Sequence, residues 1–485
     1  MKGLVAVSLA FGLVRIAAGA DLIEVYQDAL RFDPQIREAE AQYKAAREQN
    51  PQALAALLPQ LSGSASLSRQ KEGYVSVFPE PIGPGEPLAL FGENTIQYVN
   101  TRQFGLQLQQ TVFSWPQFAT LAEAHKKVAQ ALADYRSAQQ SLIQRVATAY
   151  FNVLNAQDTL DAEQASLDAL SRQLEQANKR FEVGLIAITD VKEAEAQHDA
   201  AAAAVIQDKR NLASTQEQLR EITDQDYTSM AKPGEDMPLL TPRPADVQRW
   251  IDMSMDQNLS LVSSRLAADA ARDNVQVAFG GHLPSISITA QDMREHQDTD
   301  ESLLFSAVGV PPLGGRTTFP TGISNGEIAL QVTVPLFSGG LVQSQVRQAQ
   351  YQWIEAKDHV VTISRQTEYQ ARDAYNAVVS EIAQVSALKQ GVVSAEVALK
   401  ATEAGYEVGT RTEVDVLTER ENLVQAQTNY AQARYAYLNA IVQLQLAAGT
   451  LDVNTLEQIN GWLTLHQPEP ELPGTPRAPV APPEP

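Results

Sequence analysis

Polar residues suited to helix capping gather in two similar segments, FEVGLIAITDVKEAE at 181–195 and YEVGTRTEVDVLTE at 406–419. In each segment a glycine interrupts a long stretch rich in alanine and glutamine, and hydroxyl and carboxylate groups follow. Thr412 with Asp415, and Asp190 with Glu193, have the three-residue spacing of a capping box, in which side chains satisfy free backbone N–H groups. On these residues alone, helix capping is the favoured role of Asp190 and Asp415.

Motifs for catalysis or metal binding are weak or missing. The sequence contains no HExxH, no phosphate loop ending in GK[ST] and no GxSxG elbow. Ser386 and Lys389 match the SxxK pattern, but they lie in a helical stretch without its companion motifs, so a chance match is favoured. Asp298, Asp300 and Glu301 could hold a cation, although a solvated acidic loop is favoured. We therefore predict no enzyme, no metal site and no cofactor.

Composition excludes several further classes of protein. The 485-residue chain has a formal net charge of −21, which argues against a nucleic-acid partner because phosphate binding needs clustered Lys and Arg. It has no cysteine, which excludes disulfides and thiolate metal sites. Residues 1–20 form a predicted secretory signal, with Lys2, an apolar run and a small-residue cleavage site before Asp21. No other segment reaches about 18 uninterrupted apolar residues, so we expect an exported chain without a membrane-spanning helix.

The chain also contains an internal duplication. Three pairs of landmarks recur at offsets of 225, 224 and 225 residues, namely Leu58-Pro59 with Leu283-Pro284, Phe113-Ser114 with Phe337-Ser338, and Phe181–Gly184 with Tyr406–Gly409. This spacing predicts two repeats, each with a helix, two strands and two long helices. The expected organisation is repeat 1 at 21–225, a connector at 226–246, repeat 2 at 247–450, a C-terminal segment at 451–466 and a disordered or extended proline-rich tail at 467–485.

The strands are predicted from alternation of apolar and small polar residues. In the clearest, one face is formed by Ile328, Leu330, Val332, Val334 and Leu336. Residues 61–67, 104–108 and 285–289 alternate in the same way, and long loops are expected between paired strands, at about 70–102 and 292–327. One apolar and one small polar face are typical of a transmembrane β-barrel, but a soluble sheet packed on helices has the same pattern.

The long helices favour the membrane alternative. A seven-residue repeat of mostly apolar residues, which predicts left-handed supercoiling, runs through Leu132, Gln139, Val146, Val153, Leu160, Leu167, Leu174 and Phe181, and again through Val378, Val385, Val392, Leu399 and Tyr406. A helix over 116–180 would extend about 95 Å, so it must project away and leave the apolar strand face uncovered. Four strands cannot close a barrel, and an open edge cannot sit in lipid. We therefore expect an oligomer of two, three or four chains.

Five segments resemble the TolC family of outer-membrane efflux channels: AYFNVLNAQDTL (149–160), RFEVGLIAITDV (180–191), VPLFSGGLVQSQVRQAQY (334–351), GYEVGTRTEVDVL (405–417) and QARYAYLNA (432–440). The resemblance extends to about residue 462 and is weakest in the predicted loops and the tail. It implies an α+β membrane protein, a homotrimer whose four strands per chain complete a twelve-stranded β-barrel in outer-membrane lipid. A long coiled-coil α-helical barrel would continue it into the periplasm, with an equatorial region drawn from about 226–250 and 450–465.

The resemblance further implies an exit duct for drugs or secreted proteins. Its partners would be a periplasmic adaptor protein and an inner-membrane transporter of the RND, ABC or MFS class. Matched residue by residue, Tyr406 and Arg411 would bind Thr189 and Asp190 across the helix pairs and hold the periplasmic entrance closed. The adaptor would dock at the two helix turns, formed by Val183, Gly184, Leu185, Val408, Gly409 and Thr410.

The same resemblance places Asp415 in the pore, within an acidic ring that attracts cations. The family's second acidic ring falls at Thr418, and Glu419 lies about 100° around the helix from it. We therefore expect a single ring of three carboxylates and weaker blockade by cations. Two other classes share some of these features, a periplasmic coiled-coil adaptor and a surface adhesin using the loops and tail. In the adaptor, the alternating strands and duplicated loops would have no purpose.

Overall fold

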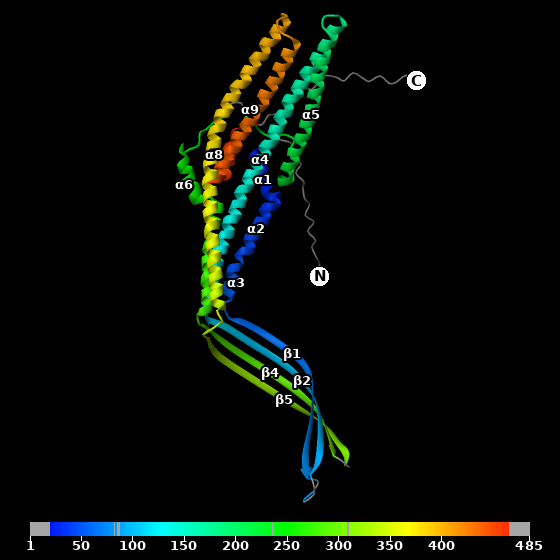
Figure 1. Ribbon diagram of the computed structural model, residues 1–485, viewed down its shortest axis with the longest axis vertical. Coiled ribbons are helices and arrows are strands. Elements are labelled where there is room, and N and C mark those ends of the chain that lie inside the picture. Colours follow the sequence, from blue (N-terminus) through cyan, green and yellow to red (C-terminus); the bar gives the residue numbers. More distant parts are fainter. Residues whose placement is uncertain (1–19, 82, 85–87, 235–236, 308–309, 465–485) are drawn as a thin grey trace, which may run out of the picture. The chain divides into compact units, whose positions relative to one another are not determined.

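The computed structural model describes residues 20–81, 83–84, 88–234, 237–307 and 310–464 (Figure 1). The predicted signal, except its last residue, and the predicted tail at 467–485 lie outside the described residues. Ala20, the last residue of the predicted signal, is buried and forms a parallel bridge with Met230. Its backbone N–H donates to the Ser229 carbonyl at 2.9 Å. Ala20 is therefore part of the folded core.

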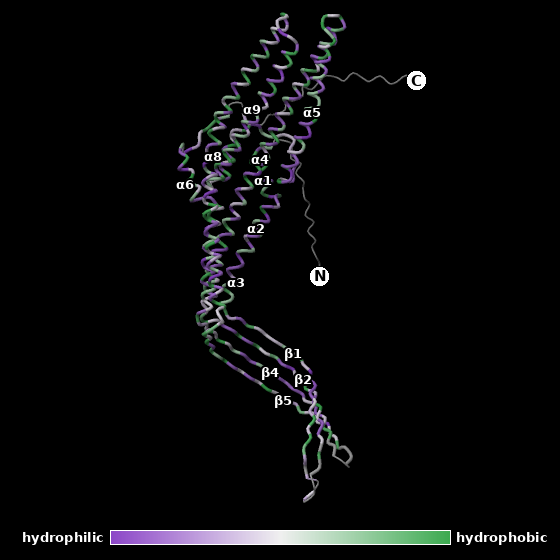
Figure 2. The backbone as a smooth tube through the Cα atoms, in the orientation of Figure 1, coloured by the Kyte–Doolittle hydropathy of each residue, from purple (hydrophilic) through white to green (hydrophobic). Residues whose placement is uncertain are grey.

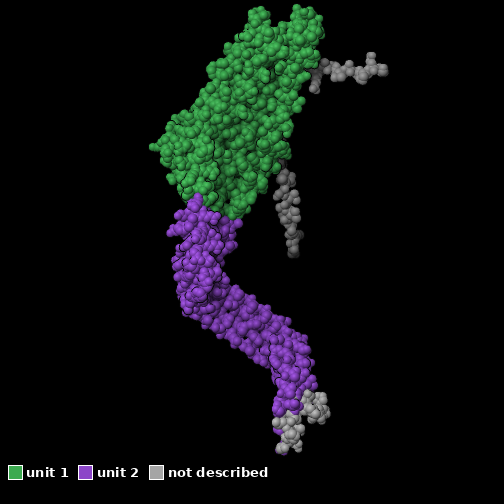
Figure 3. All heavy atoms as spheres, in the orientation of Figure 1, with its two compact units in different colours: residues 1–44, 130–265, 359–485 green, residues 45–129, 266–358 purple. Residues whose placement is uncertain are grey.

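The chain divides into two compact units, and each unit takes segments from both predicted repeats (Figure 3). The first unit comprises 1–44, 130–265 and 359–485, and the second comprises 45–129 and 266–358. The second unit contains one sheet, and the first is built mainly from helices. The repeats of the sequence and the units in space are thus different divisions of the chain.

The sheet of the second unit has four antiparallel strands in the order β1-β2-β4-β5 (Figure 1). Their bounds are β1 Gln60–Pro81, β2 Leu88–Phe113, β4 Ser285–Ala307 and β5 Val310–Thr333. The first hairpin pairs Gln60 with Gln109, and the second pairs Ser285 with Thr333. The two hairpins meet where β2 pairs with β4, so both repeats build one sheet.

The prediction of a long loop between the two strands of each pair is wrong. Residues 70–81 and 88–102 continue the ladder of β1 and β2, and 292–307 and 310–327 continue that of β4 and β5. The reason is that backbone groups form the ladder, so pairing set by one end of a hairpin continues through polar residues. The predicted acidic loop is likewise part of β4, where Asp298 pairs with Arg102 at 3.2 Å.

Hydrophobic and hydrophilic residues are interleaved along the four strands (Figure 2). Several apolar side chains on them are exposed, including Ile328 at 82% and Leu61 at 71%. The predicted apolar face extended through Val334 and Leu336, but β5 ends at Thr333. Pro335 follows two residues later, and proline cannot donate to a sheet ladder.

Eleven helical elements belong to the described parts of the chain. They are α1 Leu22–Phe32, α2 Pro34–Arg47, α3 Gln49–Ala55, α4 Trp115–Glu182, α5 Ile188–Thr223, α6 Val247–Gln257, α7 Leu259–Phe279, the 3-10 turn η1 Gly280–His282, α8 Leu341–Glu407, α9 Glu413–Ala448 and α10 Val453–Asn460. Two short strands, β3 Lys232–Pro233 and β6 Leu463–Thr464, pair with each other. None of the helices in the described ranges carries an apolar stretch long enough to cross a membrane.

The seven-residue repeat marks buried positions on the two longest helices. Among its members, Val146, Val153 and Leu160 of α4 and Val378, Val385 and Leu399 of α8 are buried. A repeat of seven keeps one face of a helix against its neighbours over many turns. The sequence pattern therefore located much of the buried face of both helices.

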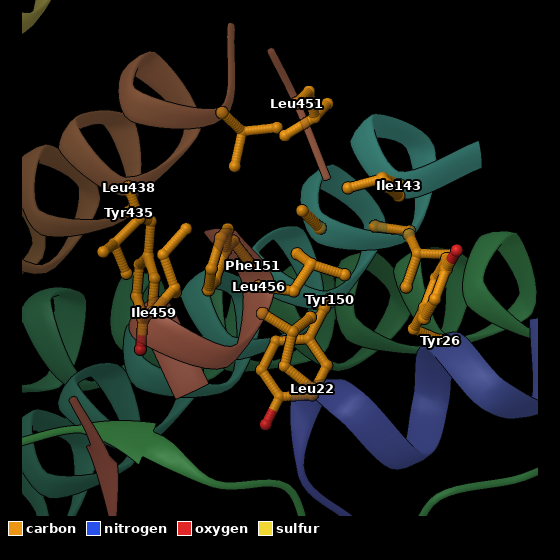
Figure 4. Packing of buried hydrophobic residues seen from close by; sticks show 14 of the residues in the cluster. Leu22, Tyr26, Ile143, Tyr150, Phe151, Tyr435, Leu438, Leu451, Leu456 and Ile459 are labelled. Atoms are coloured by element: carbon orange, nitrogen blue, oxygen red, sulfur yellow. The ribbon is translucent and has the colours of Figure 1, made fainter. Parts of the chain in front are cut away.

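The largest core cluster of the first unit joins α1, α4, α9 and α10 (Figure 4). Tyr150 and Phe151 of α4 are fully buried with ring centroids 5.7 Å apart, and Phe151 also stacks on Tyr435 of α9 at 6.2 Å. The Tyr150 hydroxyl donates to the Ala231 carbonyl at 2.8 Å, and Lys232 forms an ion pair with Asp158 at 2.7 Å. The segment containing β3 is thus bonded to the helix core.

Candidate helix-turn gate

Both long helices end at a glycine with a left-handed backbone. Gly184 follows α4 with φ 76°, and Gly409 follows α8 with φ 80°. A residue with a side chain is destabilised by about 1 kcal/mol or more in this backbone conformation. The N–H of Leu185 bonds to the Arg180 carbonyl at 2.9 Å, and that of Thr410 bonds to the Gly405 carbonyl at 2.8 Å. These bonds close the helices as glycine caps do, so the predicted helix breaks are confirmed.

The capping box predicted at the second turn is present. The Thr412 hydroxyl accepts the Asp415 N–H at 3.2 Å, and the Asp415 carboxylate accepts the Thr412 N–H at 2.9 Å. The hydrogen bonds from the Thr412 backbone and side chain lower the pKa of Asp415, and the charge of Arg411 adds a smaller effect in the same direction. Asp415 therefore remains ionised at the start of α9 at neutral pH.

The capping box predicted for Asp190 and Glu193 is wrong. The N-cap of α5 is Ala187, whose side chain makes no capping bond, and Asp190 is the third residue of the helix. The helix begins three residues earlier than the box requires, because Ala187 already has the extended backbone of an N-cap. Asp190 instead accepts a hydrogen bond from the Thr189 hydroxyl at 3.3 Å, and its charge suits the positive helix N-terminus.

A hydrogen-bonded chain centred on Tyr406 joins α4, α8 and α9. The Tyr406 hydroxyl accepts from Arg180 Nη1 at 2.8 Å and donates to Glu413 Oε2 at 3.2 Å. The Arg180 guanidinium also lies over the Tyr406 ring, 5.4 Å from its centroid. Gln173 Nε2 donates to the second oxygen of Glu413 at 3.1 Å. Burial raises the pKa of Tyr406, and the neighbouring Glu413 charge raises it further, so its hydroxyl stays protonated.

A second contact near Tyr406 joins two of these helices, α8 and α9. Arg420 of α9 forms an ion pair with Glu403 of α8 at 2.8 Å. Sequence reasoning identified Tyr406 but missed Arg180, Glu413 and Gln173. One signal was available, because Gln173 and Arg180 are seven residues apart and therefore lie on one face of α4.

The structure brings two of the four predicted gate residues to one cleft. Tyr406 and Asp190 line a cleft of about 340 Å³ together with Glu193 and the start of α9. Arg411 and Thr189 are not among the residues that line it. Within one chain the Tyr406 hydroxyl is bonded to Arg180 and Glu413, as described above. Of the four predicted gate residues, Tyr406 and Asp190 are therefore neighbours around one cleft.

The predicted docking and pore residues lie at the same two turns. The apolar side chains of Val183, Leu185 and Val408 are exposed by 70–76%. Thr418 is exposed, and its hydroxyl donates to the Val414 carbonyl of the preceding turn at 2.9 Å. Within the described ranges, no group of three or more His, Cys, Asp or Glu side chains is placed to hold a metal ion.

Comparison with known proteins places the chain in a family. The model of the outer membrane efflux protein family matches it twice, at residues 25–224 and 250–450. The chain belongs to the outer membrane efflux protein family. The double match agrees with the two predicted repeats, and it confirms the resemblance to TolC-type channels and the predicted location in the outer membrane.

This outer membrane efflux protein has relatives over nearly its whole length. It is 35% identical to outer membrane protein TolC of Escherichia coli, over 93% of this chain and 87% of that protein. It is 28% identical to the alkaline protease secretion protein AprF of Pseudomonas aeruginosa, over 90% and 86%. The outer membrane channel CmeC of Campylobacter jejuni, 21% identical, has the same fold, with a TM-score of 0.69 over 91% of this chain and 89% of that one.

Proposed function

We propose that this protein is the outer-membrane exit duct of a tripartite efflux or type I secretion system, gated at its periplasmic helix turns. The observation that carries the proposal is the similarity of nearly the whole chain to TolC and to the protease secretion protein AprF. The relatives named above are channel and secretion proteins. Drugs or secreted proteins would pass through a tunnel that the chain builds with copies of itself.

The duct is a homotrimer. The sheet has two outer strands, β1 and β5, whose second edges find no partner within the described chain. Unpaired edges are unstable in lipid, so copies of the chain pair them edge to edge. Three chains with four strands each supply twelve strands, enough for a closed barrel, and the exposed apolar side chains of the strands would face lipid. The long helices, with their seven-residue repeat, would form the coiled-coil tunnel wall.

The gate lies at the turns after α4 and α8. Tyr406 and Arg411 would engage Thr189 and Asp190 when the helix pairs of the trimer close, and the shared cleft of Tyr406 and Asp190 supports this assignment. Asp415 would form the acidic constriction, and Thr418 takes the place of a second ring. The capping box at Asp415 supports a fixed position for its carboxylate, so capping and cation attraction operate together.

The exposed turn residues form the docking site for a periplasmic adaptor. Their apolar side chains, Val183, Leu185 and Val408, are available for helix packing against a partner hairpin, and Gly184, Gly409 and Thr410 permit close approach. The adaptor connects the duct to an inner-membrane transporter of the RND, ABC or MFS class. In such an assembly the transporter selects the exported substrate.

Single-channel conductance in a planar bilayer tests the duct and its gate together. We expect a small conductance from the purified wild-type oligomer and a sharp rise in Tyr406→Phe/Arg411→Ser. The matched control is Tyr369→Phe/Arg365→Ser, which makes the same chemical changes at two exposed positions of α8 and should leave the conductance unchanged.

The outcomes separate the duct from the gate. If the protein conducts but the gate substitutions have no effect, the proposal of a duct stands, and Tyr406 and Arg411 have structural roles instead of a role in the gate. A folded oligomer that never conducts would overturn the duct. The alternative in that case is a periplasmic coiled-coil adaptor, which would also separate from the outer-membrane fraction.

A further inference from the structure

An open groove of about 300 Å³ lies in the first unit, among α8, α9 and the segment that follows β3. Its apolar wall consists of Met237 and Leu239 from that segment, Val385 and Val393 from α8, and Tyr430 from α9. Val385 is buried, whereas Val393 keeps 48% of its surface exposed. The groove therefore has an apolar floor that solvent and an extended peptide can reach.

The polar side of the groove is positively charged. Lys389 and Arg434 line it together with Ser386 and Gln390, and none of the described residues that line it is acidic. This composition stands out in a chain with a net charge of −21. Within the described chain Lys389 has no ion-pair partner. The groove is therefore complementary to a ligand that combines carboxylates with an apolar group.

Arg434 is held in place without being neutralised. Its Nη2 donates to the carbonyls of Pro233 and Gly234 at 2.6 and 2.7 Å, and its guanidinium lies 5.5 Å from the centroid of the Tyr430 ring. The two carbonyl oxygens accept hydrogen bonds from the guanidinium, but they carry no net charge and so do not neutralise it. The fixed guanidinium thus remains available to a carboxylate.

The described chain ends beside this groove. Leu463 of β6 pairs with Pro233, and Thr464 pairs with Lys232. The Gly234 N–H donates to the Trp462 carbonyl at 3.2 Å. The carbonyl of Pro233 is the same group that Arg434 of the groove contacts. Leu463 is therefore paired with a residue whose carbonyl bonds to a side chain of the groove, and Thr464 lies one residue further along β6.

The sequence beyond this anchor has the chemistry that the groove requires. Residues 467–474 read QPEPELPG, with two glutamates spaced by prolines and followed by a leucine. Glu469 lies five residues after Thr464, and five extended residues reach about 17 Å. Peptides with proline at this spacing bind grooves in a preformed polyproline conformation at low entropic cost.

We propose that residues 468–472 bind in this groove of the same chain. Glu469 and Glu471 balance the charges of Lys389 and Arg434, and Leu472 lies on the apolar wall. Because the segment is tethered beside its site, its effective concentration is in the millimolar range, so two partly exposed ion pairs and one leucine suffice for occupancy. The bound segment joins α8, α9 and the connector on the outside of the core.

The absence of natural cysteines makes disulfide formation a clean test. In the full-length chain, Ser386→Cys with Pro473→Cys keeps all four charges and the leucine. The matched control is Ala387→Cys with Pro473→Cys, because Ala387 is also exposed but lies about 100° further around α8, off the groove. Under mild oxidation we expect an intrachain disulfide at least fivefold faster in the first pair than in the control.

Charge reversal then tests the ion pairs. Glu469→Lys/Glu471→Lys, added to the Ser386→Cys/Pro473→Cys pair, should slow the disulfide about fivefold to tenfold, which is the combined effect of two exposed ion pairs. Adding Lys389→Glu should restore part of the rate. Equal rates at positions 386 and 387, disulfides formed mainly between chains, or a rate insensitive to the glutamate reversal would each overturn the proposal.

Discussion

Replacing Arg180 tests whether the hydrogen-bonded chain at Tyr406 stabilises the closed turns. Arg180 donates to the Tyr406 hydroxyl at 2.8 Å and lies over its ring at 5.4 Å. A hydrogen bond from a charged donor contributes about 1.5–3 kcal/mol, and partial exposure of both residues reduces this to about 1 kcal/mol. The cation–π contact adds about 0.5–1 kcal/mol. Arg180→Gln should therefore destabilise the closed arrangement by about 1.5–2 kcal/mol per chain.

In each chain, this free energy corresponds to a shift of about 10- to 30-fold in the ratio of open to closed turns. The assay is the open probability of single channels in a planar bilayer, at one voltage and one salt concentration. Lys179→Gln is the matched control, because it removes the neighbouring positive charge. Lys179 is exposed, and its ion-pair partner among the described residues is Glu175 of the same helix. We expect no change in this control.

Two results would refute the reasoning. If Arg180→Gln leaves the open probability unchanged while Tyr406→Phe raises it, then the arginine contact does not hold the gate tyrosine. If Lys179→Gln opens the channel as much as Arg180→Gln, then the net positive charge of the turn matters, and the contact with Tyr406 does not.

Three further predictions concern buried and charged groups. Asp33→Asn should lower the unfolding free energy by about 3 kcal/mol in denaturant titration, because it leaves the partly buried Arg145 guanidinium without its ion-pair partner. Burial, with repulsion from two nearby carboxylates, raises the pKa of Glu163. The folded protein is therefore more stable when Glu163 is protonated at low pH, and this stability is lost as pH rises and the carboxyl ionises. Glu163→Gln should therefore raise the thermal midpoint at pH 8, and this gain should vanish below about pH 4. Thr418→Asp should let cobalt block the channel current at a concentration on the order of tenfold lower, because it adds carboxylates beside Asp415.

The sequence by itself determined the helix breaks and much of the buried helix face. Gly184 and Gly409 mark turns because only glycine takes a left-handed backbone without cost, and both have positive φ. The Thr412–Asp415 capping box is likewise local, since its partners are three residues apart. Such features depend on neighbours in the chain, so a sequence pattern is sufficient to locate them.

The length of the strands is set by pairing between strands and not by the local sequence pattern. Alternation predicted the end of each strand that adjoins a helix in the chain, but it assigned the remainder of each strand to a loop. Pairing continues to Pro81 opposite Leu88, and to Ala307 opposite Val310. A ladder forms between backbone groups of two segments, so its end depends on the partner strand as much as on side-chain type.

The partners of Tyr406 were decided only by the tertiary structure. Arg180 lies 226 residues away in the chain, and no spacing rule connects the two. The contact exists because α4, α8 and α9 pack together and bring Arg180, Tyr406 and Glu413 within hydrogen-bond distance. Local backbone chemistry therefore determined where the turns lie, and helix packing determined which side chains meet there.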